Sequence, residues 1–195
     1  MHLMIAPGIY AVGGRHLSGS EDGLTLLVLL NETPILIGCG SGKGIELLLR
    51  NIIELGVDPR SIDYILAPLP HPSIVNGCRA LSQIIKPRHI VAPPEIARTL
   101  YQGIGVEPCP VSLVSNTVSI DSGSVSVMCI HEKVSLIKVV QRDRILCILL
   151  TDSTAIRSFK DIESIKDLLA SSQCALSRLC LYDECMCRTL QVRTP

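Results

Sequence analysis

Short apolar runs and one amphipathic stretch open the first half of the chain. The runs at 9–12, 24–30 and 34–37 are separated by Gly, Ser, Asp and Asn, which predicts strands joined by tight turns in a meander. Over 44–55 the apolar residues recur at intervals of three and four, which predicts an amphipathic helix that stops at Gly56. We then expect alternating elements: strands at 64–66 and 89–92, and helices at 75–85 and 94–100.

After Gly103 the pattern changes to a second series of short strands. We expect strands at 106–114, 117–120, 125–130, 136–140 and 145–150, closed by a helix at 156–170, whereas the tail from Cys174 onward is harder to place. Each half is thus strands followed by helix, which predicts two sheets packed face to face with helices outside. The length of 195 residues suits one domain, whose two halves, about 1–103 and 104–195, pair their sheets.

Composition narrows the classes of partner. Lys+Arg and Asp+Glu are equal at 18 each and aromatic residues make up only 3%, so neither phosphate clamps nor stacking platforms for nucleic acid are expected. The longest apolar runs, such as 145–150, are far too short to cross a bilayer, and no basic region leads into an apolar core at the N-terminus. We therefore expect a soluble, cytoplasmic protein with no membrane partner.

The nine cysteines fall into two groups. The first five are scattered through apolar segments, where a thiol acts as a small buried hydrophobe. An odd count in a reducing compartment argues against a disulfide framework, with thermophile cytosols as the known exception. Cys174, Cys180, Cys185 and Cys187 lack the paired Cys-x-x-Cys spacing of zinc sites, so a metal or redox role and a role as apolar strand residues both stay open.

A glycine-rich loop, Gly38-Cys-Gly-Ser-Gly-Lys-Gly44, lies between a predicted strand and a predicted helix, where backbone amides could hold a phosphate. The spacing does not support that interpretation. A P-loop needs glycine at 37 and Ser or Thr at 44, which are Ile37 and Gly44, and the dinucleotide pattern has Lys43 where glycine is required. We expect a plain turn.

Several segments taken together resemble a known family. Gly8-Ile-Tyr-Ala-Val-Gly-Gly, Ser18-Gly-Ser, Ile35-Leu-Ile-Gly-Cys-Gly-Ser41 and Ile62-Asp-Tyr-Ile-Leu66 resemble, in order and spacing, the N-terminal half of the metallo-β-lactamase superfamily. The resemblance covers most of the first hundred residues. It implies a four-layer αβ/βα sandwich.

The family's metal motif, Thr-His-x-His-x-Asp-His, follows the strand that corresponds to 62–66 and binds one or two zinc ions. Carried across without gaps, it falls on Pro68-Leu-Pro-His-Pro-Ser-Ile74, so the resemblance makes His71 the second histidine. Leu69 stands for the first histidine, Ser73 for the aspartate and Ile74 for the third histidine. The loop resembles a metal loop that has lost most of its ligands.

Two further ligands are implied by the resemblance. Ile130-His131-Glu-Lys-Val-Ser135 is similar to the family's Gly-His-Thr-Pro-Gly-Ser, and Leu149-Leu-Thr-Asp152-Ser-Thr is similar to the segment of the bridging aspartate. The final histidine has no counterpart, because no histidine follows His131, and the aspartate of the Leu-Ile-Asp-x-Gly turn is Gly38. Three of the family's seven usual ligands therefore remain: His71, His131 and Asp152.

This reduced set leaves two functions open. In the first, the protein is a degenerate, non-hydrolytic member that binds a partner or assembles with itself or another protein; Leu69 and Ile74 bring hydrocarbon to the pocket, His131 is a core histidine and Asp152 caps a helix. In the alternative, two imidazoles and one carboxylate hold a single zinc or iron ion, and the protein hydrolyses a small ester, thioester or phosphoester, with Ser73 orienting water. We favour the first.

Overall fold

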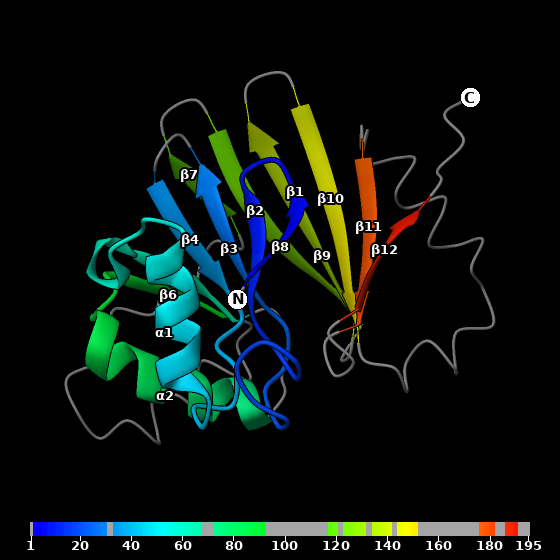
Figure 1. The fold of residues 1–195 in the computed structure, drawn as a ribbon. Helices are drawn as coiled ribbons and strands as arrows, with labels where there is room; N and C mark the ends of the chain where they lie inside the picture. Colours follow the sequence, from blue (N-terminus) through cyan, green and yellow to red (C-terminus); the bar gives the residue numbers. More distant parts are fainter. Residues whose placement is uncertain are drawn as a thin grey trace, which may run out of the picture.

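The chain builds two six-stranded sheets, shown in Figure 1. The computed structural model describes residues 2–30, 33–67, 72–92, 117–120, 123–131, 134–141, 144–151, 176–181 and 186–190. The first sheet has the order β1-β2-β3-β4-β5-β6 and the second the order β12-β11-β10-β9-β8-β7. Every strand of the first sheet comes from the N-terminal part of the chain, and every strand of the second from the C-terminal part.

The first sheet is a meander extended by two parallel strands. Its antiparallel strands are β1 (Leu3–Ala6), β2 (Ile9–Gly13), β3 (Thr25–Leu30) and β4 (Thr33–Ile37), and its parallel ones are β5 (Tyr64–Leu66) and β6 (His89–Val91). The connections are α1 (Ile45–Glu54), the short 3₁₀ helix η1 (Pro59–Ser61) and α2 (Pro72–Ile85). Figure 1 shows α1 and α2 together on one side of this sheet, with the second sheet on its other side. The periodicity predicted all of these elements except β1 and η1.

The second sheet is antiparallel apart from the pairing of β10 with β11. Its strands are β7 (Thr117–Ile120), β8 (Gly123–His131), β9 (Val134–Gln141), β10 (Arg144–Thr151), β11 (Leu176–Leu181) and β12 (Met186–Leu190). Strands 7 to 10 were predicted to within two residues. The last two strands were missed, because polar and apolar residues do not alternate along the cysteine-rich tail.

The core lies between the sheets, where their apolar faces meet. On β9 and β10 the alternation of a strand puts Ile137, Val139, Ile148 and Leu150 into this core, together with the apolar faces of β2 to β5. Residues of the opposite face, such as Leu149, are buried as well. The elements predicted at 94–100, 106–114 and 156–170 lie outside the described residues, as does the boundary near 103 between the two halves.

The sandwich has two ends. At one end the hairpin turns of both sheets meet: a methyl group on Gly8 would come 3.8 Å from Oε1 of Gln141, and one on Gly123 would come 2.7 Å from Cδ1 of Leu30. We call this the hairpin end. The opposite, loop end carries the glycine-rich loop 38–44 and the last residues of β8 and β10. Within the described ranges, no helix is both long and apolar enough to cross a membrane.

Candidate functional site

The loop end brings together the strand ends that precede the predicted ligands. Leu66 ends β5, and the next residue, Ala67, donates its backbone N–H to the carbonyl oxygen of Val91 at 2.8 Å, so the loop toward His71 starts from a strand that lies between β4 and β6. Across the sandwich, β8 ends at His131 and β10 ends at Thr151, the residue before Asp152. The topology therefore points all three segments to one end.

The register of the second sheet brings two of the segments close together. Val134 of β9 pairs with His131 on one side and with Thr151 on the other. Positions 131 and 151 are thus two strand spacings apart, about 10 Å between their backbones. Thr151 itself is buried. The structure therefore supports a common location for the segments of His131 and Asp152, at the level of the backbone.

The side chains of the predicted site residues are not among those that the structure describes. His71 and Asp152 lie outside the described residues altogether. Ser73 is the second residue of α2 and His131 the last of β8, but their side chains lie outside the description as well. Whether these residues converge on one ion stays a prediction. Among the described residues, no group of three or more His, Cys, Asp or Glu side chains is placed to hold a metal ion.

A buried carboxylate organises the frame around the site. Asp22 accepts hydrogen bonds from Ser18 Oγ at 2.6 Å and from the backbone N–H of Ser41 at 2.8 Å, and Ser41 Oγ donates a further one. Gly14 N–H donates in turn to Ser18 Oγ at 2.9 Å. This Asp22 network joins the loop after β2 to the glycine-rich loop after β4. Asp22 was not among the residues predicted for the site. The feature of the sequence that points to it is the polar segment Ser18-Gly-Ser-Glu-Asp-Gly.

A second link between the loop after β2 and α1 is a buried amide. Asn51 is 1% exposed, and its Nδ2 donates to the carbonyl of Val12 at 2.7 Å and to that of Leu17 at 3.2 Å. A buried side chain that bonds backbone carbonyls fixes the path of a loop that has no regular structure of its own. The loop after β2 is therefore fixed at the loop end by two sets of buried hydrogen bonds, those of the Asp22 network and those of Asn51.

The glycine-rich loop is a structural turn, and the plain-turn interpretation fits it better than phosphate binding. Ser41 donates its backbone N–H and its hydroxyl to Asp22, so two donors of the loop are already engaged by a carboxylate. A negatively charged partner inside the structure also disfavours a phosphate at the same position.

Gly38, which stands where the family has an aspartate, has a backbone that disfavours any side chain. Its φ is +83°, in the left-handed region that L residues rarely adopt. A Cβ there would lie 2.7 Å from the carbonyl oxygen of Leu24, which is backbone and cannot rotate away. The missing aspartate is thus matched by a backbone that has no room for it.

A disulfide ties the glycine-rich loop to α2, and this corrects the expectation that the cysteines form no disulfide framework. Cys39 and Cys78 are bonded, with 5.0 Å between their Cα atoms and a sequence separation of 39. Both side chains are buried. The expectation was wrong because it treated buried cysteines as isolated hydrophobes, whereas the fold packs α2 directly against the loop after β4.

The backbone of α2 lies closer to the glycine-rich loop than a residue with a Cβ atom would allow. A Cβ on Gly77 would come 2.2 Å from the carbonyl oxygen of Gly40 and 2.3 Å from that of Cys39. Glycine at 77 therefore lets the helix backbone reach the loop and brings Cys78 within bonding distance of Cys39. Since α2 begins at Pro72, directly after His71, the disulfide also anchors the helix that follows the candidate metal loop.

The cysteines of the second sheet include further half-cystines. Cys147 and Cys180 are both disulfide-bonded and buried. Cys180 lies on β11 and is aligned with Cys187 of β12 in the antiparallel register. Cys180 of the tail is thus a buried strand residue in a disulfide and not a free thiol; Cys174 and Cys185 lie outside the described residues.

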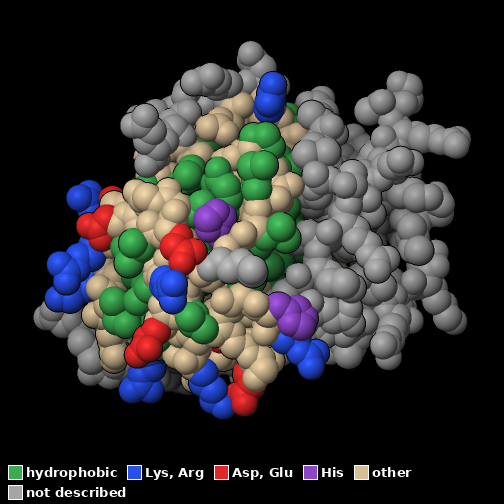
Figure 2. All heavy atoms as spheres, viewed as in Figure 1, with side chains coloured by type: hydrophobic (Ala, Val, Ile, Leu, Met, Phe, Trp, Pro, Cys, Tyr) green, Lys and Arg blue, Asp and Glu red, His purple; other side chains and the backbone are tan. Residues whose placement is uncertain are grey.

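Among the residues coloured in Figure 2, Lys and Arg side chains are interspersed with Asp and Glu on the face shown. Among the described residues, exposed ion pairs join Lys43 to Glu21, Arg50 to Glu54 at 3.2 Å and Arg88 to Asp63 at 3.3 Å. A surface of alternating sign offers no stripe along which a phosphate backbone could bind.

Solved structures resemble this fold, whereas no protein-family model and no curated protein sequence matches the chain. A metallo-β-lactamase of Cronobacter sakazakii with a HARLDQ motif is 17% identical with a TM-score of 0.67, over 92% of this chain and 80% of that one. GOB-18 from Elizabethkingia meningoseptica is 12% identical with a TM-score of 0.60, over 91% and 75%. SMB-1, solved with bound 2-mercaptoethanesulfonate, is 13% identical with a TM-score of 0.65, over 91% and 78%. The chain has the metallo-β-lactamase fold, and the predicted fold class is confirmed.

Proposed function

We propose that this chain is a diverged member of the metallo-β-lactamase superfamily that keeps the fold, has a degenerate metal site and acts by binding or assembly rather than by hydrolysis. The observation that carries the proposal is the donor set: hydrocarbon stands at two ligand positions, Leu69 and Ile74, and Ser73 stands at a third. Loss of even one ligand or of its supporting partner weakens metal binding by large factors.

The geometry at Gly38 supports the same proposal. At this position φ is +83° and the Leu24 carbonyl oxygen fills the space that a Cβ would take. The backbone therefore has no room for a carboxylate side chain at position 38, which supports a degenerate site.

An assembly role is supported by the edge of the first sheet. β1 is the edge strand, and its Leu3 and Met4 are 56% and 62% exposed. An edge strand offers unpaired backbone groups, and apolar side chains on it favour contact with another chain. We propose a second copy of this chain, or another protein, as the partner at β1.

The alternative is a mononuclear metal-dependent hydrolase, and the register of β8, β9 and β10 favours it. Val134 lies between His131 and Thr151, so the segments of two candidate ligands flank one strand. Two imidazoles and one carboxylate fit a zinc or iron ion with an open position. In that case His71, His131 and Asp152 would hold the ion, which would supply activated water for hydrolysis of a small ester, thioester or phosphoester, and Ser73 would orient that water.

Hydrolysis assays separate the two functions. Purified protein supplied with zinc or iron is assayed on p-nitrophenyl acetate, a thioester and bis-p-nitrophenyl phosphate, beside His71→Ala, His131→Ala and Asp152→Ala. The proposal predicts that the wild type and all three variants give the same background rates. A rate that needs added metal and falls at least a hundredfold in each variant would establish the hydrolase instead.

The predicted cytoplasmic location is kept as a proposal with a condition set by the disulfides. Disulfides persist in oxidising compartments, and in the cytosol chiefly in hyperthermophiles. A cytoplasmic protein with the Cys39–Cys78 bond would therefore belong to such a cytosol. Thiol alkylation in intact cells tests this: both cysteines should resist the reagent in the cytosolic fraction, and their labelling there would contradict the proposal.

A further inference from the structure

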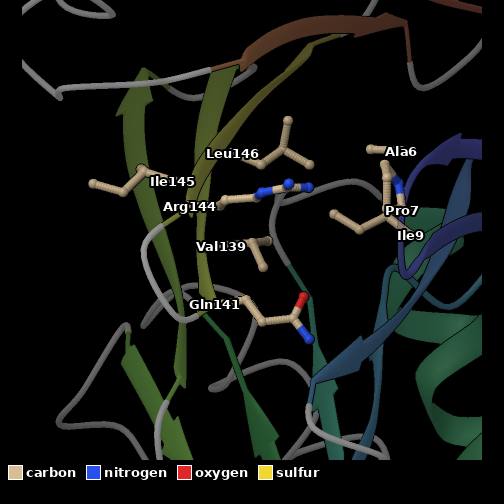
Figure 3. A pocket seen from close by; sticks show the side chains of 8 residues that line it. All are labelled: Ala6, Pro7, Ile9, Val139, Gln141, Arg144, Ile145 and Leu146. Atoms are coloured by element: carbon tan, nitrogen blue, oxygen red, sulfur yellow. The ribbon is translucent and has the colours of Figure 1, made fainter.

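A cavity opens at the hairpin end, on the side of the sandwich away from the candidate metal site. Its volume is about 270 Å³, and it lies between the β1–β2 turn and the β9–β10 hairpin. The first sheet contributes Ala6, Pro7 and Ile9, and the second contributes Val139, Gln141, Arg144, Ile145 and Leu146 (Figure 3). The lining is largely aliphatic.

Two polar side chains of the second sheet line the cavity, on the same face as the core residues of β9 and β10. In the register of β9 and β10, Ile137 pairs with Ile148, Val139 with Leu146 and Gln141 with Arg144. Because side chains alternate along a strand, these three pairs lie on one face. The first pair is fully buried in the core, whereas in the last pair Gln141 is half-buried and Arg144 is exposed. The apolar row therefore ends at the mouth of the cavity in a guanidinium beside an amide.

The two polar groups face the cavity together. Figure 3 shows the side chain of Arg144 extended across the cavity toward Ala6 and Pro7, with the amide of Gln141 directed to the same side. Within the part of the chain that the structure describes, neither the Arg144 guanidinium nor the Gln141 amide has a hydrogen bond or ion pair. A cation and an amide thus converge on an apolar hollow with donors to spare.

We propose that this cavity binds a short- or medium-chain aliphatic carboxylate. The tail packs against Ile9, Val139 and Leu146, and the head accepts hydrogen bonds from the Arg144 guanidinium and the Gln141 amide. The planar fork of arginine matches the two oxygens of a carboxylate, so this head group fits better than a single-point anion. The volume lies just below the usual range of about 300–1,000 Å³ for ligand clefts, which favours a small ligand over a long-chain lipid.

Calorimetric titration of the full chain with sodium octanoate tests the proposal. A ligand of this size should bind with a dissociation constant on the order of 0.1–1 mM. Arg144→Gln should weaken binding about tenfold or more, since it removes a charge-assisted hydrogen bond. The matched control is Lys138→Gln, which removes a cation from the neighbouring strand β9 and from the opposite face of the sheet, and should leave the affinity unchanged.

Two further measurements keep the test decisive. Octanol and palmitate, tested as neutral and long-chain probes, should each bind more weakly than octanoate. Methyl NMR should place the octanoate shifts at Ile9, Val139 and Leu146. The proposal is overturned if binding of octanoate does not reach saturation, or if Arg144→Gln binds octanoate as well as the wild type does. It is also overturned if octanol or palmitate binds as tightly as octanoate, or if the NMR shifts fall at the loop end. Melting curves of both variants confirm that each is folded.

Discussion

Gly38 and Gly56 have nearly the same backbone conformation but different surroundings, which makes them a matched pair. Their φ values are +83° and +78°; a Cβ on Gly38 would meet the Leu24 carbonyl oxygen at 2.7 Å, whereas a Cβ on Gly56 would meet nothing within 4 Å. Gly56→Ala should therefore cost only the left-handed strain, about 1–2 kcal/mol. Gly38→Ala should cost at least about 3 kcal/mol, because an overpacking penalty is added.

Urea unfolding of the two glycine variants measures this difference directly. Equal losses of unfolding free energy would show that the loop can move away from Leu24. In that case the family's turn aspartate could be restored at position 38, and the structural support for a degenerate site would be lost.

Asp22 is expected to be the most sensitive polar residue of the loop end. Replacement by alanine leaves donors of Ser18 and Ser41 without their acceptor in a buried place, which should lower the unfolding free energy by about 2–4 kcal/mol. Its neighbour Glu21 is the control: it forms only an exposed ion pair with Lys43, so Glu21→Ala should cost less than about 0.5 kcal/mol. Similar losses in thermal unfolding would contradict the role given to the Asp22 network.

For single residues, the sequence showed which residue types depart from the family better than it showed which atoms those residues contact. The resemblance singled out Gly38 as a departure from the family, but only the backbone dihedral and the Leu24 carbonyl oxygen explain why glycine is needed there. Asp22 was not predicted, because its partners Ser18 and Ser41 are brought to it by folding and not by a recognisable spacing.

Among the elements, α2 depends most on a covalent link. The Cys39–Cys78 bond closes a loop of 39 residues, and in the chain-entropy account such a loop stabilises the fold by up to about 4 kcal/mol. Cys39→Ser, Cys78→Ser and the double variant should therefore all lose about 2–4 kcal/mol, by the same amount in each case. Non-reducing peptide mapping should find the 39–78 pair in the wild type.

Additive losses in the two serine variants would contradict the disulfide, since the second substitution should cost nothing once the bond is gone. Unfolding of the wild type in reductant is a poorer test, because Cys147 and Cys180 are disulfide-bonded too and would also be reduced.

The edge strand β1 is expected to carry the assembly surface. The double substitution Leu3→Lys, Met4→Lys places two charges on an edge strand whose apolar side chains are exposed in the wild type. It should therefore convert an oligomer to a monomer, as measured by light scattering coupled to size exclusion. Leu47→Lys on α1 is the control, because Leu47 is also exposed, at 47%, but lies on a helix away from the edge. A wild-type monomer, or an equal effect of the control, would remove the support for assembly through β1.

The elements with strong periodicity were predictable, and those made by pairing were not. The apolar stripe of α1 and the short apolar runs of β8 to β10 can be seen directly in the sequence. β11 and β12 form because β10 offers an edge in parallel register to Leu176–Leu181, a long-range partner that no local pattern reveals.

For the whole molecule, the fold is shared with metallo-β-lactamases although few residues are identical. The two sheets and the helices over the first of them match those structures at 12–17% identity, so the pattern of apolar positions specifies the fold more than the individual residues do. The sequence could predict the fold for that reason. It could name candidate ligands but not their convergence, because His71, His131 and Asp152 lie on segments that are brought together by long-range packing, which no local pattern reveals.

Metal stoichiometry of protein produced in zinc- and iron-supplemented medium is the most direct test of a degenerate site. Mass spectrometry of the native protein and elemental analysis should both find well below one zinc or iron per chain, with no difference between the wild type and His71→Ala or Asp152→Ala. A tightly bound metal at about one per chain, lost in both variants, would contradict the account and assign the loop end to a metal-dependent hydrolase.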